Sequence, residues 1–182
     1  GVVLEIGAWD GFFDSNCANL WSNGSYNGIL IEATSKLNIA DLESRYDNIN
    51  CYRELISSSN TLEDVIDKCK FDVDEDNFVL ASIDVDGDDL NVARSLGKYK
   101  PIILIVEPNG DVITRSNSNG STIKELIDFG VDFGYDFMGM SGHVGRHSGN
   151  VYLIRNDYKD KFDICSKPWQ QRGIILSEGV LY

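Results

Sequence analysis

The chain has 182 residues, which suits a single domain with one sizeable core. Its hydrophobic fraction, 42%, is ordinary, and no apolar run approaches the roughly 20 residues of a membrane span. The formal net charge of −13 argues against nucleic acid as a partner, because proteins that bind the phosphate backbone usually present a basic face. We therefore expect neither a nucleic-acid partner nor a membrane partner.

Cysteine usage and the first residues suggest where the protein works. None of the four cysteines forms a C-x-x-C pair, and none has zinc-finger spacing to a histidine. The first ten residues include two acids and no basic residue, unlike the start of a signal peptide. We therefore expect reduced, mostly buried thiols in a cytoplasmic protein.

The first half of the chain alternates short apolar runs with segments of helical spacing. The runs VVLEI and GILIE suit buried strands. Thr61 is a good helix N-cap, because acids follow it in the first turn. The expected elements are strands at 2–7, 28–32 and 49–55, and helices from 14–16 to about 21, at 35–45 with Ser35 as a possible cap, and at 61–69.

The second half continues the same alternation. NFVLASID and PIILIVE are its strongest strand signals, and Ser121 or Thr122 can cap a helix. The expected elements are strands at 77–84, 101–107, 135–140 and 150–154, and helices at 89–96 and from 121 or 122 to about 129. The tail, 169–182, could be an edge strand, a swapped arm or an end ordered only in crystals.

Strands separated by helices indicate an α/β fold with a mainly parallel central sheet. The strands are almost continuously apolar, as expected when helices cover both faces of the sheet. In such sheets ligands bind beyond the carboxyl ends of the strands. Acids stand at four of those ends, so one crevice could collect the segment from Glu5 to Asp10 together with Glu32, Asp84 and Glu107.

The stretch VVLEIGAWDG is the most informative of these ends. Its spacing is E-x-G-x-x-x-G, and its glycines let the backbone approach a nucleotide-like ligand. Glu32 stands where a carboxylate could accept hydrogen bonds from both ribose hydroxyls, and Asp10 could face an ammonium group. These acids would repel a phosphate, which favours S-adenosylmethionine, a cofactor with a ribose and two cationic groups. We expect Trp9 to border the pocket, and Phe12 and Phe13 to pack in the core.

The acidic run DVDGDD, 84–89, has several readings. With Glu107 and Asn109 it could hold Mg²⁺ through oxygen ligands. As a D-x-D motif it could instead serve a phosphatase or a glycosyltransferase, which gives the alternative of a metal-dependent phosphoryl or glycosyl enzyme using Asp84 and Asp86. A similar acidic run at 72–76 fails as an EF-hand loop, because glycine and glutamate are missing at the required positions.

Five motifs stand in the order and spacing of a known family. VLEIGAWDG, GILIEA, TLEDVI, SIDVDGDD and IILIVEPN resemble class I S-adenosylmethionine-dependent methyltransferases, and the FkbM-type methyltransferases most of all. The later segments GYDFMGM and NVYLIRND are similar to the closing strands of that family, so the resemblance covers about residues 2–158. It implies a Rossmann-like three-layer α/β/α sandwich, with a methyltransferase domain at 1–160 and a C-terminal extension of unassigned role at 161–182.

The resemblance also implies roles for single residues. Glu32 would bind the ribose, with Ala33 beside it near the adenine, and Asp84 would face the cofactor ammonium or the reacting centre. An acid that contacts adenine after the third strand is not evident, because Ser57–Asn60 occupies that region. The methionine part of the cofactor would be cradled by Glu5, Gly7, Ala8, Asp10 and Gly11.

Methyl transfer to a hydroxyl requires an aligned acceptor and a base that removes its proton. The candidate bases are Asp84, Asp86, His143 and His147, of which we assign Asp84 and His143 as catalytic. The resulting hypothesis is O-methylation of a small hydroxylated acceptor such as a sugar. The alternative from another class is a non-catalytic Rossmann-like binding module. No feature of the sequence indicates which oligomeric state the protein adopts.

Overall fold

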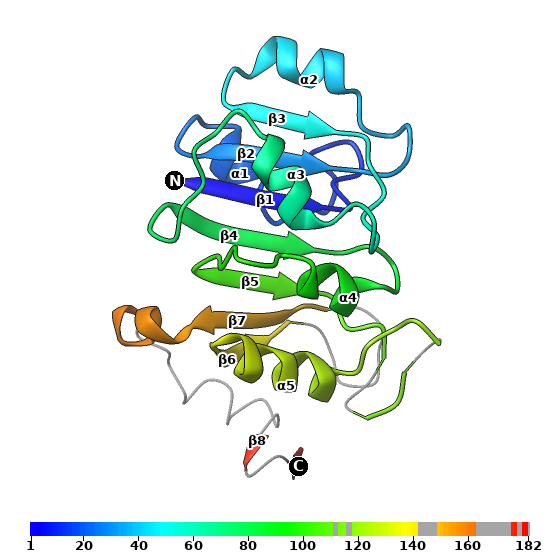
Figure 1. Ribbon diagram of the computed structural model, residues 1–182, viewed down its shortest axis with the longest axis vertical. Coiled ribbons are helices and arrows are strands. Elements are labelled where there is room, and N and C mark those ends of the chain that lie inside the picture. The colour runs from blue at the N-terminus through cyan, green and yellow to red at the C-terminus, as the bar shows by residue number, and fades with distance from the viewer. Residues whose placement is uncertain (111–112, 116–117, 142–148, 163–175, 178–179, 182) are drawn as a thin grey trace.

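The computed structural model describes residues 1–110, 113–115, 118–141, 149–162, 176–177 and 180–181. The centre of the molecule is a seven-stranded sheet in the order β3-β2-β1-β4-β5-β7-β6 (Figure 1). Its strands are β1 (Val2–Ile6), β2 (Asn27–Ile31), β3 (Ile49–Tyr52), β4 (Phe78–Ile83), β5 (Ile103–Val106), β6 (Tyr135–Met140) and β7 (Val151–Arg155).

The first five strands are parallel. β1 pairs with β2 on one side and β4 on the other, while β3 and β5 extend the sheet outward. β7 runs antiparallel to β5, and β6 runs antiparallel to β7, so β6 again points in the common direction. The predicted α/β fold with a mainly parallel central sheet is confirmed.

Helices cover both faces of this sheet, which gives three layers. On one face the buried core includes side chains of α3, α4 and α5, which lie in front of the sheet in Figure 1. On the other face it includes side chains of α1 and α2. The helices are α1 (Ala18–Trp21), α2 (Ile39–Arg45), α3 (Leu62–Lys68), α4 (Asp89–Arg94) and α5 (Ile123–Phe133), with a 3-10 helix, η1 (Asn156–Lys161).

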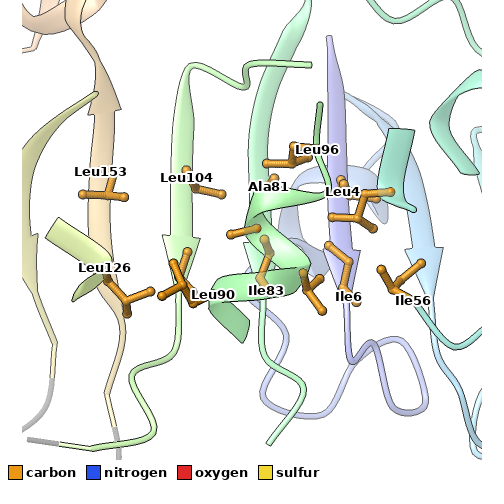
Figure 2. Close-up of a cluster of buried hydrophobic side chains, with 14 of the residues drawn as sticks. Leu4, Ile6, Ile56, Ala81, Ile83, Leu90, Leu96, Leu104, Leu126 and Leu153 are labelled. Atoms are coloured by element: carbon orange, nitrogen blue, oxygen red, sulfur yellow. The ribbon is translucent and has the colours of Figure 1, made fainter. Parts of the chain in front are cut away.

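The core explains why β1 is apolar at every position except Glu5. All five of its residues are buried, because alternate side chains enter the two helical layers. Figure 2 shows Leu4 and Ile6 of β1 in the same layer as Ala81 and Ile83 of β4. Each such apolar side chain contributes about 1.5–3 kcal/mol on burial, so β1 is anchored firmly at the middle of the sheet.

Several predicted boundaries were wrong, each for a local reason. β3 ends at Tyr52 rather than at 55, because its pairing with β2 ends there. The Tyr52 carbonyl accepts from the Glu32 N–H, just past the last pair of the ladder, Ile31 and Tyr52. α2 begins at Ile39, since Asn38 rather than Ser35 caps it by accepting from the Asp41 N–H. α1 is one turn long and is preceded by a bend around Ser15, whose hydroxyl oxygen accepts from two backbone N–H groups.

Two predicted helix caps were correct. Thr61 caps α3 with a capping box. Its hydroxyl oxygen accepts from the Asp64 N–H, and the Asp64 carboxylate accepts from the Thr61 N–H. Thr122 does the same for α5 with Glu125. α5 continues past the predicted end at 129 to Phe133 and stops at Gly134, which has a left-handed φ of 95°. Glycine takes that conformation without the strain that a side chain would cause.

Beyond the sheet, β8 (Leu176–Ser177) and β9 (Val180–Leu181) form a separate antiparallel pair. The domain division at 160 stays a prediction. In the described part of the chain no helix combines the length and the apolar run needed to cross a bilayer. Cys17, Cys51 and Cys69 are free thiols, and the first two are buried.

Candidate functional site

A cavity of about 470 Å³ opens at the carboxyl ends of β1, β2, β3 and β4. The arrowheads of these strands point the same way in Figure 1, so the segments that follow them meet at one edge of the sheet. This is where a parallel sheet binds ligands, as predicted from the sequence. The volume lies within the usual range of small-molecule sites, about 300–1,000 Å³.

The turn after β1 forms one wall of the cavity. Gly7 has a φ of 78°, and a Cβ there would lie 1.7 Å from the carbonyl oxygen of Asp84. Any side chain at this position would therefore push the turns after β1 and β4 apart. The N–H groups of Gly7 and Ala8 both donate to the Ile31 carbonyl, which ties the same turn to β2.

Glu32, directly after β2, is buried and lines the cavity. Its Oε2 accepts from the Trp9 N–H at 3.0 Å, and its Oε1 accepts from the Thr34 N–H at 2.7 Å. Each carboxylate oxygen can accept a further hydrogen bond. Glu32 can therefore hold the turns after β1 and β2 together and still receive two hydroxyl groups of a ligand.

Glu5 of β1 is the second buried acid of the lining. It accepts from the Ser15 hydroxyl and, at 2.8 Å, from the Asn16 N–H. Burial raises the pKa of Glu5 to about 7, although these hydrogen bonds oppose the shift. The Asn16 side-chain amide donates to the Ser82 hydroxyl of β4, so the bend before α1 is fixed to two strands at once.

Three residues predicted to cradle the cofactor lie outside the cavity lining. Ala8 is buried in the core on the α1 and α2 face of the sheet, and Gly11 packs against Leu42 of α2. Asp10 accepts from the N–H groups of Phe12 and Phe13 at 2.9 and 2.8 Å, which lower its pKa. These residues shape the turn. Among the other predicted cofactor residues, the structure brings together Glu5, Gly7, Glu32, Ala33 and Asp84.

Asp84 follows β4, and Glu107 follows β5 on the neighbouring strand. The Glu107 N–H donates to the Ile83 carbonyl, and the two carboxyl groups share a hydrogen bond. Partial removal from water is the main cause that raises the pKa of Asp84, and together with repulsion from Asp84 it raises the pKa of Glu107 to about 8. Two carboxyl groups this close repel each other when both are ionised, so the pair favours a shared proton.

Asp86 completes a group of three acids with this pair. One carboxylate oxygen from each of Asp84, Asp86 and Glu107 lies within 4.8 Å of the others. Oxygen ligands of this kind suit Mg²⁺, but exposed acidic groups are common without a metal. Asn109, which the sequence grouped with these ligands, instead donates its side-chain amide to Asp89 at 2.7 Å.

One acid of the lining was not predicted from the sequence. Glu54 follows β3 and borders the cavity, and its carboxylate accepts from the Asn60 side chain. It was hidden because the predicted strand ran to 55, which put Glu54 inside the strand. The segment RELIS, 53–57, carries the signal that could have revealed Glu54, because its polar residues interrupt the apolar alternation of a strand.

Aromatic side chains rim the cavity. Trp9 lines it, as predicted, and the Lys36 ammonium lies 4.8 Å from the centre of its ring. Phe13 also lines the cavity and is 66% exposed, so the prediction that it packs in the core was wrong. Phe12 is 42% exposed and contacts the Trp21 ring.

His143 and His147 lie outside the described residues, so the predicted catalytic role of His143 stays a prediction.

The charge of the lining is uniform. No lysine, arginine or histidine is among the described residues that line it. The chemistry of these groups suits a ligand with hydroxyls and positive charge, and it disfavours phosphates. The acidic lining residues are Glu5, Asp14, Glu32, Glu54, Asp84, Asp86 and Asp88.

The chain matches no protein-family model and no curated protein. It is similar to the solved 1,6-didemethyltoxoflavin N1-methyltransferase of Burkholderia thailandensis, which contains 1,6-didemethyltoxoflavin and S-adenosylhomocysteine. The identity is 13%, the TM-score is 0.51, and the match covers 86% of this chain and 71% of that one. The fold is the Rossmann-like fold of class I methyltransferases.

Two further structures share this fold. The mitomycin 7-O-methyltransferase MmcR is 13% identical with a TM-score of 0.50, and the match covers 85% of this chain. The present chain spans 48% of MmcR, about half its length. The Bacillus subtilis tRNA methyltransferase TrmK is 12% identical with a TM-score of 0.50, and the match covers 94% of this chain and 75% of TrmK. At these identities the likeness establishes the fold, and the FkbM subtype stays a prediction.

Proposed function

We propose that this protein is an S-adenosylmethionine-dependent methyltransferase that transfers the methyl group to an oxygen of a small hydroxylated acceptor. The observation that carries the proposal is the position of Glu32. Its buried carboxylate lies after β2, at the edge of the cavity, in a fold shared with methyltransferases. The uniformly acidic lining supports a cofactor that has a ribose and positive charge and no phosphate.

The proposed cofactor residues divide by chemistry. Glu32 accepts hydrogen bonds from the ribose hydroxyls, and Ala33 beside it lies near the adenine. Gly7 has no side chain, so the cofactor can come close to the backbone of the cavity wall. Glu5 faces the cationic end of the cofactor, and Asp84 faces the reacting centre. When bound, S-adenosylmethionine supplies a methyl group that is already activated by its sulfonium.

The remaining work for the chain is to orient the acceptor and remove its proton. Asp84 is the proposed base, and Glu107 shares its proton and so adjusts its basicity. His143 stays a second candidate for this role. Should Mg²⁺ take part, Asp84, Asp86 and Glu107 are the residues that would hold it, and loss of turnover after chelation tests that point. The proposed acceptor is a small molecule, and the proposal includes neither a nucleic-acid partner nor a membrane partner.

Replacing Glu32 with alanine tests the cofactor assignment. We expect the dissociation constant for S-adenosylmethionine to rise by at least about tenfold, since each hydrogen bond to a carboxylate contributes about 1.5–3 kcal/mol. The matched control is Glu75→Ala, which removes an exposed glutamate outside this cavity. Glu32 also holds two turns, so the unfolding midpoint of each variant must be measured alongside.

Turnover distinguishes the enzyme from a binding module. The wild-type chain is mixed with S-adenosylmethionine and a panel of polyhydroxylated acceptors, and S-adenosylhomocysteine and methylated product are measured. We expect both, with the new methyl group on oxygen. Tight binding without product across the panel would instead favour a non-catalytic module, and unchanged affinity in a folded Glu32→Ala variant would refute the ribose assignment.

A further inference from the structure

Asp89 is the most deeply buried carboxyl group at the edge of the sheet, with an exposed fraction of 0%. It is the first residue of α4, yet its side chain points back to the turn that follows β4. One oxygen accepts from the Val85 N–H at 2.7 Å, and the other accepts from the Gly87 N–H at 3.0 Å. A buried carboxylate requires such partners, and here they come from the turn that carries Asp84 and Asp86.

The same carboxylate reaches the next strand. The side-chain amide of Asn109, just after β5, donates to Asp89 at 2.7 Å. Asp89 therefore joins the segments after β4 and β5, which are the two segments that carry Asp84 and Glu107. The turn needs this support, because Asp86 has a φ of 59°, a left-handed conformation that strains any residue other than glycine.

We propose that Asp89 is a positioning residue, whose carboxylate fixes the turn 84–87 against the end of β5 and so holds Asp84 beside Glu107. This inference rests on the proposed function, in which Asp84 removes the acceptor proton. Asp89 itself does not line the cavity, so it acts through the turn and touches neither cofactor nor acceptor. The cofactor groups after β1 and β2 are held by other contacts, those of Glu32 and Glu5.

The decisive variant is Asp89→Asn, which has nearly the same shape. An asparagine oxygen can accept from the Val85 N–H, but its NH₂ group then faces the Gly87 N–H and the Asn109 amide, which are also donors. We expect kcat to fall by about tenfold or more while the dissociation constant for S-adenosylmethionine changes by less than about twofold. Amide hydrogen exchange in 84–87 should become faster. Asp132→Asn, an exposed change on α5, is the matched control.

Asn109→Ala serves as the second variant in case Asp89→Asn does not fold. It leaves the Val85 and Gly87 contacts in place and removes only the link to β5, so kcat should fall in the same direction by a smaller factor. A folded Asp89→Asn variant with unchanged kcat, or with unchanged exchange in 84–87, would overturn the inference. Equal losses of cofactor affinity and kcat would overturn it too, since they indicate general loss of the site.

The two proposals fail in different ways. A wild-type chain that gives no turnover contradicts the proposed function, and the catalytic part of the positioning role falls with it. The exchange measurement needs no substrate, so it still decides whether Asp89 holds the turn.

Discussion

At the scale of residues, the site consists of carboxylates whose neighbours decide what each can do. Glu32 keeps two turns together and lines the cavity with acceptor sites to offer, whereas Asp10 holds its own turn through Oδ1 and lies outside the cavity lining. Sequence alone predicted both as ligand residues, because acids after strands look alike in one dimension. It could not predict the difference, which depends on how the backbone turns after each strand.

The buried Glu5 predicts a pH dependence of stability. Its pKa is about 7 in the folded chain, against an ordinary value of 4.5. Between these values the folded chain keeps a proton that the unfolded chain has lost, so the free energy of unfolding falls as the pH rises, and the loss levels off above about 7. The shift corresponds to about 3 kcal/mol at most.

Glu5→Gln tests this directly, because an amide stands in for the protonated acid at every pH. Urea unfolding at pH 5 and pH 8 should show a smaller loss of stability in Glu5→Gln than in the wild type. Burial also raises the pKa of Asp89 and of Glu107, so the wild type alone is not sufficient, and only the difference between the two chains reports on Glu5. Identical pH dependence in both would contradict the assignment.

At the scale of elements, local signals determine where helices begin, and pairing between strands determines where strands end. Thr61 and Thr122 were identified as caps from the sequence because a capping box is local. The end of β3 was not, since it depends on whether β2 still offers a partner beyond Tyr52. That error concealed Glu54, which shows that a misplaced strand end can remove a site residue from view.

The cap of α5 gives a prediction at this scale. Thr122 accepts from the Glu125 N–H at 3.1 Å, and the Glu125 carboxylate accepts from the Thr122 N–H at 2.9 Å. Thr122→Ala should lower the free energy of unfolding by about 1–2 kcal/mol. Ser44→Ala, which removes an exposed hydroxyl inside α2, should change it by less than about 0.5 kcal/mol. Chemical denaturation compares the two, and equal effects would show that the box does not stabilise α5.

At the scale of the whole molecule, the site exists only because the sheet brings distant segments together. The motifs gave the strands and their order along the chain, and the rule for parallel sheets placed their carboxyl ends at one edge. The order across the sheet and the reversal of β7 could not be derived from periodicity, because pairing is a property of the packed chain. The hydrogen bond from Asn109 to Asp89 could not be predicted either, because it forms only when β4 and β5 are neighbours in the sheet.

The most direct test of the central claim is calorimetric titration of the folded chain with S-adenosylmethionine, S-adenosylhomocysteine and ATP. All three contain adenosine, and only ATP adds phosphates. The acidic cavity should bind the two sulfur compounds at one site, with dissociation constants below about 1 mM, and should not bind ATP measurably in the same range. Binding of ATP as tight as that of S-adenosylmethionine, or no binding of either sulfur compound at millimolar concentration, would contradict the account.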